Sequence, residues 1–447
     1  MTAPARYGEA FFWLAVLVGA NFVGSTSRPQ YGLFLVGCAG LAHSCIHFWR
    51  EGHNRIGASA IFAFATGLFL HFPAVYTYFD GSESAFEFFL LASSACLASQ
   101  IAIFQFLVPL GLGRGLDAYE ARRCQRMSSA AWLLLALNLT LYVLIAIGLR
   151  VPGLERSAAF ALLVLFAVCA ARSTLPALLT LPLCALLFLL YTEFLFAGLG
   201  RLILGTLGLA VAMCFSVRWA DRRVKASILI VAVPVLTYMV TWRTSFAINV
   251  QGYENAEGSG IASILAPFVR FSQLLELDLA GSLDHVGFGT LFATAVIWIP
   301  RQYWSDKPVG FGAELAEIFT PHLVRYGQSD AGSVYGEALY SFGWVGIVLA
   351  PIVIGCFLVL ADRLLIILES SAPPVAAYAL GIVLASGVAD LVWSGTFTYV
   401  SRAGVRVLIL LAIILLTVGI RLPAADVRRV GPGLSGQGSR DLAFRHH

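Results

Sequence analysis

Charged residues are scarce in this chain of 447 amino acids, because Asp, Glu, Lys and Arg together make up only 12% of it. Soluble globular proteins carry about 25% charged residues. Hydrophobic residues reach 59% instead, and the mean hydropathy is +0.83. A single soluble core cannot bury this much apolar surface, because such cores stop growing beyond about 250–300 residues. The composition therefore excludes a water-soluble enzyme, a disordered chain and a secreted disulfide scaffold, and it predicts a polytopic membrane protein.

Familiar metal, nucleotide and disulfide motifs are also missing. The sequence contains no CxxC pair, no HExxH, no Walker-type loop and no GxSxG. Its 8 cysteines lie in apolar segments or in one basic loop, so we interpret them as small core residues. His43 and His47 have a spacing that would suit a metal, but no third ligand accompanies them, which favours a packing role. We therefore expect no metal and no cofactor. The net charge of +4 is spread along the chain and gives no indication of nucleic-acid binding.

Apolar segments long enough to cross a bilayer recur along the chain. A transmembrane helix needs about 20 mostly apolar residues, and this criterion predicts about twelve spans. Arg6 precedes the first segment without a convincing cleavage site, so we expect that segment to be retained as a span. The predicted spans are Phe11–Gly24, Tyr31–Phe48, Gly57–Phe79, Ala85–Leu112, Ala130–Leu149, Ala158–Ala171, Leu175–Leu199, Leu202–Val217, Ala226–Val250, Glu337–Leu360, Val375–Trp393 and Val405–Ile420.

The distribution of basic residues predicts how these spans are oriented. Cytoplasmic loops of membrane proteins are enriched in Lys and Arg. With both termini in the cytoplasm, most of the 29 basic residues fall on the inner side, and the alternation holds through every short loop. Residues 1–421 then form one transmembrane domain, and the Gly- and Arg-rich tail 422–447 is predicted to be a disordered cytoplasmic end.

One long outer loop, residues 251–333, interrupts this pattern. It contains two amphipathic segments, Ile261–Leu279 and Phe311–Tyr326, which have apolar residues at helical spacing. Between them lies an apolar run, Val286–Ile299, which is too short to cross the membrane and is typical of a re-entrant or interfacial segment. Loops longer than about 12–15 residues are uncommon unless they are functional or disordered. We therefore expect this loop to be folded on the outer membrane face and to carry the active region.

Basic residues in and next to this loop are suited to binding phosphate. Guanidinium groups bind phosphate oxygens in a bidentate manner, and Lys adds a point charge. Several such cations at a membrane surface would suit a lipid diphosphate. Headgroup anchoring or pairing with Asp306, Glu276 or Asp278 is the alternative for each of them. The candidate diphosphate ligands are Arg243, Arg270, Arg301, Lys307 and Arg325.

Acids, histidines and aromatic residues on the same side are candidates for catalysis and acceptor binding. Glu337 begins a predicted span, where a carboxylate could deprotonate a sugar hydroxyl or pair with an arginine. His322 and Asp330 are further catalytic candidates, although Asp330 or Ser333 could instead cap the following helix. The possible acceptor-binding residues are Tyr303, Trp304, Tyr326, Ser333, Asp390 and Arg402.

Two runs of sequence resemble a known family. Ile299-Pro-Arg-Gln-Tyr-Trp-Ser-Asp-Lys-Pro308 and Ser333-Val-Tyr-Gly-Glu-Ala-Leu-Tyr-Ser-Phe-Gly-Trp-Val-Gly346 are similar to bacterial oligosaccharide repeat-unit polymerases of the O-antigen (Wzy) type. The resemblance covers roughly the last third of the chain, and the rest matches only in its pattern of spans. It implies an all-α, C-type glycosyltransferase-like fold in the bacterial inner membrane, with the long loop on the periplasmic side.

The resemblance also implies an activity. Members of this family transfer a growing glycan from undecaprenyl diphosphate to the next lipid-linked repeat unit, without a metal. Arg301, Lys307 and Glu337 are the positions to which the family pattern carries over. Cations would stabilise the departing diphosphate, and inversion at the anomeric carbon is expected. The expected partners are undecaprenyl-diphosphate-linked oligosaccharides, membrane lipid and a protein that regulates chain length.

Three other functions remain open on the sequence. An O-antigen ligase shares the span count and the large outer loop but passes glycan to lipid A core. Transferases that use polyprenyl monophosphate sugars generally place acids in the first outer loop, and Ser25–Gln30 has none. A polysaccharide-lipid transporter would favour charges and broken helices at mid-membrane, whereas here the polar residues collect at one face.

Overall fold

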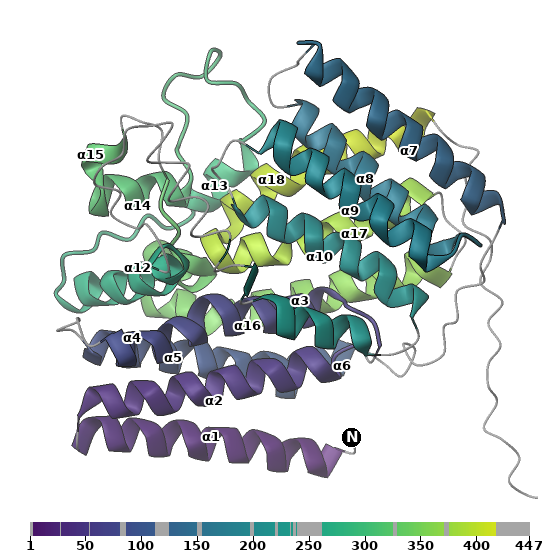
Figure 1. Ribbon diagram of the computed structural model, residues 1–447. Coiled ribbons are helices and arrows are strands. Elements are labelled where there is room, and N and C mark those ends of the chain that lie inside the picture. The colour runs from purple at the N-terminus through teal and green to yellow at the C-terminus, as the bar shows by residue number, and fades with distance from the viewer. Residues whose placement is uncertain are drawn as a thin grey trace, which may run out of the picture.

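The structure is a computed structural model in which all the elements are helical (Figure 1). It describes residues 3–26, 28–52, 54–80, 86–111, 125–149, 154–196, 201–219, 222–232, 234–235, 238, 262–324, 329–370 and 375–416.

The first helices form an antiparallel layer, at the bottom of Figure 1. Close packing of α1 on α2 depends on glycine, because a Cβ on Gly32 would lie 2.8 Å from the Cα of Gly24. Small residues permit such close approach between transmembrane helices. The helices of this layer are α1 (Ala3–Thr26), α2 (Pro29–Arg50), α3 (Ala58–Thr66), α4 (Phe72–Asp80), α5 (Phe86–Ile101) and α6 (Val108–Gly111), with π-helical turns at Gly67–His71 and Ala102–Leu107.

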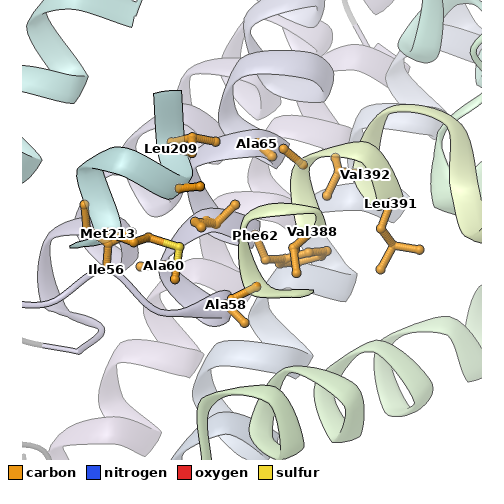
Figure 2. Close-up of a cluster of buried hydrophobic side chains, with 14 of the residues drawn as sticks. Ile56, Ala58, Ala60, Phe62, Ala65, Leu209, Met213, Val388, Leu391 and Val392 are labelled. Carbon is orange, nitrogen blue, oxygen red and sulfur yellow. The ribbon is translucent and has the colours of Figure 1, made fainter. Parts of the chain in front are cut away.

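The central and last helices pack around α8, whose side chains are buried along most of its length. Figure 2 shows one part of this core, where Ala58 and Phe62 from α3 lie near Met213 from α10 and Val388 from α18. The elements of this part are α7 (Gln125–Ala146), α8 (Leu154–Arg172), α9 (Ala177–Leu195), α10 (Arg201–Arg218), α16 (Ser333–Ser370), α17 (Val375–Ser386) and α18 (Val388–Leu416).

Four shorter helices gather at one end of the bundle. They are α12 (Ala262–Leu279), α13 (Gly289–Ala295), α14 (Phe311–Phe319) and α15 (Pro321–Val324). In Figure 1 they lie on the left, whereas the N-terminal end of α1 lies on the right. The described part of the loop that the sequence places on the outer face is therefore folded, with α12 and α14 over the two predicted amphipathic segments. We refer to this end as the outer end, because the distribution of basic residues predicts that orientation.

Nine helices within the described residues are long and apolar enough to cross a membrane. They correspond to nine of the predicted spans. Two more correspond to shorter apolar helices, Leu202–Arg218 and Val375–Ser386, and Ala226–Val250 lies largely outside the described residues. Large apolar side chains cover the outside of the bundle, among them Leu178, which is 90% exposed, and Leu415, which is 79% exposed. Such surfaces are suited to lipid, so the chain is a membrane-embedded protein, and its described elements are all helical.

Candidate functional site

Two long helices are broken at glycines near the outer end. Gly343 in α16 has φ 61° and ψ −147°, and Gly395 in α18 has φ 81° and ψ −167°. This part of backbone space is essentially restricted to glycine. The break in α18 is sharp, because Arg402 contacts Asp390, although a straight helix would separate them by about 18 Å along its axis. Gly395 is thus a turn between two helical segments, which explains why the sequence predicts two spans where α18 runs.

The break at Gly343 leaves two backbone carbonyls without their helical donors, and the preceding loop satisfies them. The N–H of Val286 donates to the carbonyl of Tyr340 at 3.2 Å, and that of Gly287 donates to the carbonyl of Ser341 at 2.8 Å. A break in a helix must find such partners, since unpaired buried backbone groups are costly. The loop before α13 is therefore fixed to α16 through its backbone.

The break at Gly395 is filled by the side chain of Glu337, which is 4% exposed. Its Oε2 accepts a hydrogen bond from the backbone N–H of Thr396 at 2.6 Å, and its Oε1 accepts one from the Thr396 hydroxyl at 2.8 Å. Thr396 begins the second half of α18, so the carboxylate occupies the positive end of a helix dipole. The carboxylate that the sequence predicts to be catalytic thus lies at the junction of two broken helices.

Helix α13 bridges these two breaks with one polar face. The Thr290 hydroxyl lies 2.9 Å from the Ser341 hydroxyl on α16, and the Thr294 hydroxyl lies 3.5 Å from that of Thr396 on α18. Residues four positions apart share a helix face, so α13 presents both threonines inward. The apolar run that the sequence predicts to be re-entrant or interfacial therefore contains a short helix packed between α16 and α18.

The cationic turn predicted around Arg301 and Lys307 packs against the second half of α18. A Cβ on Gly404 would overlap the Trp298 ring at 2.2 Å, and one on Gly310 would overlap the Phe397 ring at 2.3 Å. The turn therefore approaches α18 through glycines at both of its ends. Phe397 directly follows Thr396, the residue that binds Glu337, so the turn and the buried carboxylate meet at adjacent positions.

Within this turn the predicted ligands have different environments. Lys307 donates through Nζ to the carbonyls of Ile297 at 2.8 Å and Ile299 at 2.9 Å. Arg301 is exposed, and its guanidinium has no hydrogen-bond or ion-pair partner among the described residues. Tyr303 is 79% exposed, and the Trp304 ring meets that of Phe292 edge-on with centroids 6.1 Å apart. The guanidinium of Arg301 is thus available to bind an incoming anion, whereas the ammonium group of Lys307 already donates to two carbonyls.

Arg270 is engaged in an ion pair. Its Nε lies 3.0 Å from Oδ2 of Asp330 and its Nη1 donates to Gln273 at 2.7 Å, while its guanidinium stands 4.9 Å from the centre of the Phe319 ring. Thr320 also donates to Asp330, at 3.3 Å. The partner of Arg270 is therefore Asp330. The sequence pattern did not predict this pair, because the partners considered for the basic residues were Asp306, Glu276 and Asp278. Together they fasten α12 to the segments that flank α15.

We expect Asp330→Asn to loosen this attachment. Removing the carboxylate charge weakens hydrogen bonds from Arg270 and Thr320, which together should lower the stability by about 1–2 kcal/mol. Thermal unfolding in detergent, with Asp306→Asn as the control, would measure the loss. Asp306 is exposed and contacts only the neighbouring Ser305 hydroxyl among the described side chains. Equal unfolding temperatures for the two variants would contradict a role of Asp330 in holding the loop.

The remaining predicted residues are divided between this end and the regions not described. His322 lies exposed on α15. Ser333 caps α16, because its hydroxyl accepts the N–H of Gly336 at 3.1 Å, so the capping role weighed for this position is the one observed. The predictions for Arg243, Arg325 and Tyr326 lie outside the described residues. Asp390 and Arg402 form an ion pair at 2.5 Å on α18.

Sequence reasoning missed several residues of this site. Thr396 and Thr294 carry no signal of their own, because isolated threonines are common in apolar helices. Glu314 on α14 is half-buried next to the hydroxyl of Tyr340, and burial raises the pKa of its carboxyl. Its place in an amphipathic segment could have marked it. Gly343 and Gly395 interrupt apolar runs, which is a recognised signal of a break.

Helix lengths give the depth of the site. The segment from Trp344 to Ala361 carries no charged residue, and its 18 residues span about 27 Å. This length nearly fills a hydrocarbon core of about 30 Å. Gly343 therefore lies at the outer boundary of the core. The chain folds back there, because a Cβ on Gly346 would overlap the backbone carbonyl of Ala338, so Glu337 lies beside the first turn after the break, about 5 Å from the boundary. The polar residues of the breaks thus lie close to the outer boundary and not at mid-membrane.

No protein-family model matches the sequence, and neither a curated protein nor a solved structure is significantly similar to it. The site itself is thus the basis for a functional proposal.

Proposed function

We propose that the protein is a membrane glycosyltransferase that polymerises undecaprenyl-diphosphate-linked oligosaccharide repeat units at the periplasmic face of the bacterial inner membrane. One observation carries the proposal. Thr396 binds the buried Glu337 carboxylate, while the adjacent Phe397 packs against Gly310 at the end of the cationic turn. A general-base candidate and a phosphate-binding candidate are thereby held against the same end of one helix, at the membrane boundary.

The cationic turn is the proposed donor site. Arg301 is exposed and unpaired among the described residues, so it can form bidentate hydrogen bonds to phosphate oxygens. Lys307 is already held by two carbonyls, and it contributes positive charge nearby. As the glycosidic bond to the diphosphate breaks, negative charge develops on the leaving oxygen, and these cations stabilise it. Trp298, packed on α18, fixes the turn at headgroup level.

Glu337 is the proposed general base. The acceptor sugar hydroxyl loses its proton to the carboxylate as its oxygen attacks the anomeric carbon, opposite to the departing diphosphate. Attack from the opposite side inverts that carbon. Both carboxylate oxygens are bound by Thr396, so substrate binding must free one of them. Since the hydroxyl contact is made by a rotatable side chain, Oε1 is the oxygen that can be released.

The bilayer supplies the rest of the rate enhancement. Both substrates are lipid-linked, so the membrane keeps them at the level of the site and reduces the entropic cost of bringing them together. In this proposal both termini are cytoplasmic and the loop 251–333 is periplasmic. A regulator of chain length is a possible protein partner.

The decisive experiment is reconstitution with lipid-linked repeat units, followed by gel analysis of the glycans. We expect a ladder of longer glycans that Arg301→Gln and Arg243→Gln each abolish. Arg28→Gln is the matched control, because Arg28 is also exposed and precedes α2 at the predicted outer face. A normal ladder from both variants would contradict the donor site.

Two other outcomes would change the proposed function. Transfer of glycan to lipid A core would identify a ligase that uses the same donor site. Movement of lipid-linked glycan across the bilayer without elongation would identify a transporter. The broken helices are a feature of transporters, but transporters place their sites near mid-membrane, and the breaks described above lie at the boundary. Their position favours glycosyl transfer.

A further inference from the structure

The second half of α18 carries an uncompensated positive charge in the interior of the bundle. Arg406 is 3% exposed, and its guanidinium carbon stands 3.8 Å from the centre of the Phe160 ring on α8. Asp390 is fully buried and pairs through Oδ1 with Nη1 of Arg402 at 2.5 Å. Among the described residues, Nη1 of Arg406 and Oδ2 of Asp390 have no hydrogen-bond partner.

The charges in this cluster do not balance. Two guanidinium groups face one carboxylate, and Tyr191 on α9 is the other titratable group that influences Arg406 from a neighbouring helix. A buried charge without a partner costs several kcal/mol. Charged residues within transmembrane segments therefore usually mark a binding site or pathway. A single negative charge on a ligand would neutralise the cluster.

This cluster lies on the opposite side of α18 from the cationic turn. Arg402 and Arg406 are four residues apart and share one face of the helix. Gly404, between them, is rotated about 200° from either residue, and it is Gly404 that packs against Trp298. Arg406 faces Phe160 on α8, whereas Gly404 faces the turn. The cluster is therefore separate from the proposed donor site.

Its depth corresponds to the level of lipid phosphates. From the turn at Gly395, α18 runs back towards the inner end, because the Tyr399 hydroxyl donates to the carbonyl of Leu384 on α17 at 3.1 Å. Gly404 packs against Trp298 next to the cationic turn, and tryptophan is enriched at the headgroup level of membranes. Arg402 lies about 3 Å from Gly404 along the helix and thus belongs to that level. Arg406 lies about 6 Å deeper.

We propose that Arg402 and Arg406 bind the phosphate group of a lipid that enters from the outer leaflet. Arg402 is one-quarter exposed and offers the point of entry, while Arg406 supplies a buried donor beneath it. A lipid phosphate fits better than a free one, because the cluster lies at headgroup level between apolar helices. If the proposed function holds, this lipid is the second lipid-linked substrate, bound across α18 from the donor.

Native mass spectrometry of the full-length protein would test this site with defined lipids. The probes are phosphatidylglycerol and undecaprenyl phosphate, with phosphatidylcholine as the zwitterionic control and inorganic phosphate as the soluble competitor. We expect the wild type to retain the two anionic lipids and Arg406→Met to retain about tenfold less. Inorganic phosphate should not displace them.

Arg218→Met is the matched control. It removes the same charge from another arginine near a helix end, but Arg218 is bound to the carbonyls of Ala170 and Leu175. We expect Arg218→Met to retain lipid as the wild type does. Equal lipid retention by Arg218→Met and Arg406→Met would overturn the proposal. Binding of inorganic phosphate without binding of the lipids would show that the phosphate group at this site does not come from a lipid.

Asp390→Asn separates ligand binding from a structural role. It raises the charge of the cluster, so a ligand site should hold the anionic lipids at least as tightly as in the wild type. A purely structural Asp390–Arg402–Arg406 cluster would lose lipid in Asp390→Asn and Arg406→Met alike, which would also overturn the proposal.

Lipid retention does not require transfer activity. If no glycan ladder forms but Arg406→Met still loses lipid, only the proposed function is rejected. If the ladder forms but Arg406→Met retains lipid as the wild type does, only this lipid site is rejected.

Discussion

Glu337→Gln should reduce glycan polymerisation by about 10²–10⁴-fold, because it removes the proposed general base. The same change has a structural cost. A Gln side chain offers one acceptor oxygen where Glu337 receives two hydrogen bonds from Thr396, so one buried donor loses its partner, at about 1–3 kcal/mol. Activity therefore has to be compared at a temperature at which the variant is fully folded, as judged by thermal unfolding in detergent.

Thr396→Val provides the matched comparison. It removes the hydroxyl that binds Oε1 of Glu337 but leaves the carboxylate and the backbone N–H of residue 396 in place. We expect a loss of stability similar to that of Glu337→Gln, with at least a tenth of the activity retained. If Thr396→Val is as inactive as Glu337→Gln, the carboxylate acts only by holding the turn in α18. A normal ladder from Glu337→Gln would exclude it as the base.

The helical architecture could be predicted from composition and span length. Nine predicted spans correspond to long apolar helices, and α12 and α14 lie where amphipathic spacing placed helices in the outer loop. Span length could not predict the short α17, because its apolar run continues past Gly387 into α18. The run was assigned to one span, Val375–Trp393, and the structure divides it between two helical elements.

The contacts of the candidate site were much less accessible from sequence. Glu337 could be selected as a candidate from its position at the start of a span, but its partner Thr396 lies in another helix. Pairing of Arg270 with Asp330 likewise depends on how the loop folds back, and nearby acids such as Glu276 were the partners considered. The local sequence pattern identifies candidate residues. Which of these residues pair with each other depends on the tertiary fold.

Gly395→Ala should be strongly destabilising, and more so than Gly343→Ala at the other helix break. The backbone of Gly395, with φ 81°, strains any residue that has a Cβ, at about 1–3 kcal/mol. The added Cβ would also lie 2.3 Å from Oε2 of Glu337, and overpacking costs a further 1–3 kcal/mol or so. We expect a total loss of about 2–6 kcal/mol, measured as a lower unfolding temperature and as aggregation during size-exclusion chromatography.

Two further glycines make this prediction specific. Gly343→Ala has the same backbone strain, but its Cβ would lie 3.0 Å from Nε2 of His285, at the end of a side chain that can move. Its loss should therefore be smaller. Gly208→Ala on α10 meets nothing within 4 Å and lies in a regular helix, where alanine is favoured by up to about 1 kcal/mol. The expected order of unfolding temperatures is Gly208→Ala highest, then Gly343→Ala, then Gly395→Ala. If Gly395→Ala unfolds together with Gly208→Ala, then α18 does not turn at Gly395, and the carboxylate of Glu337 does not occupy the start of its second half.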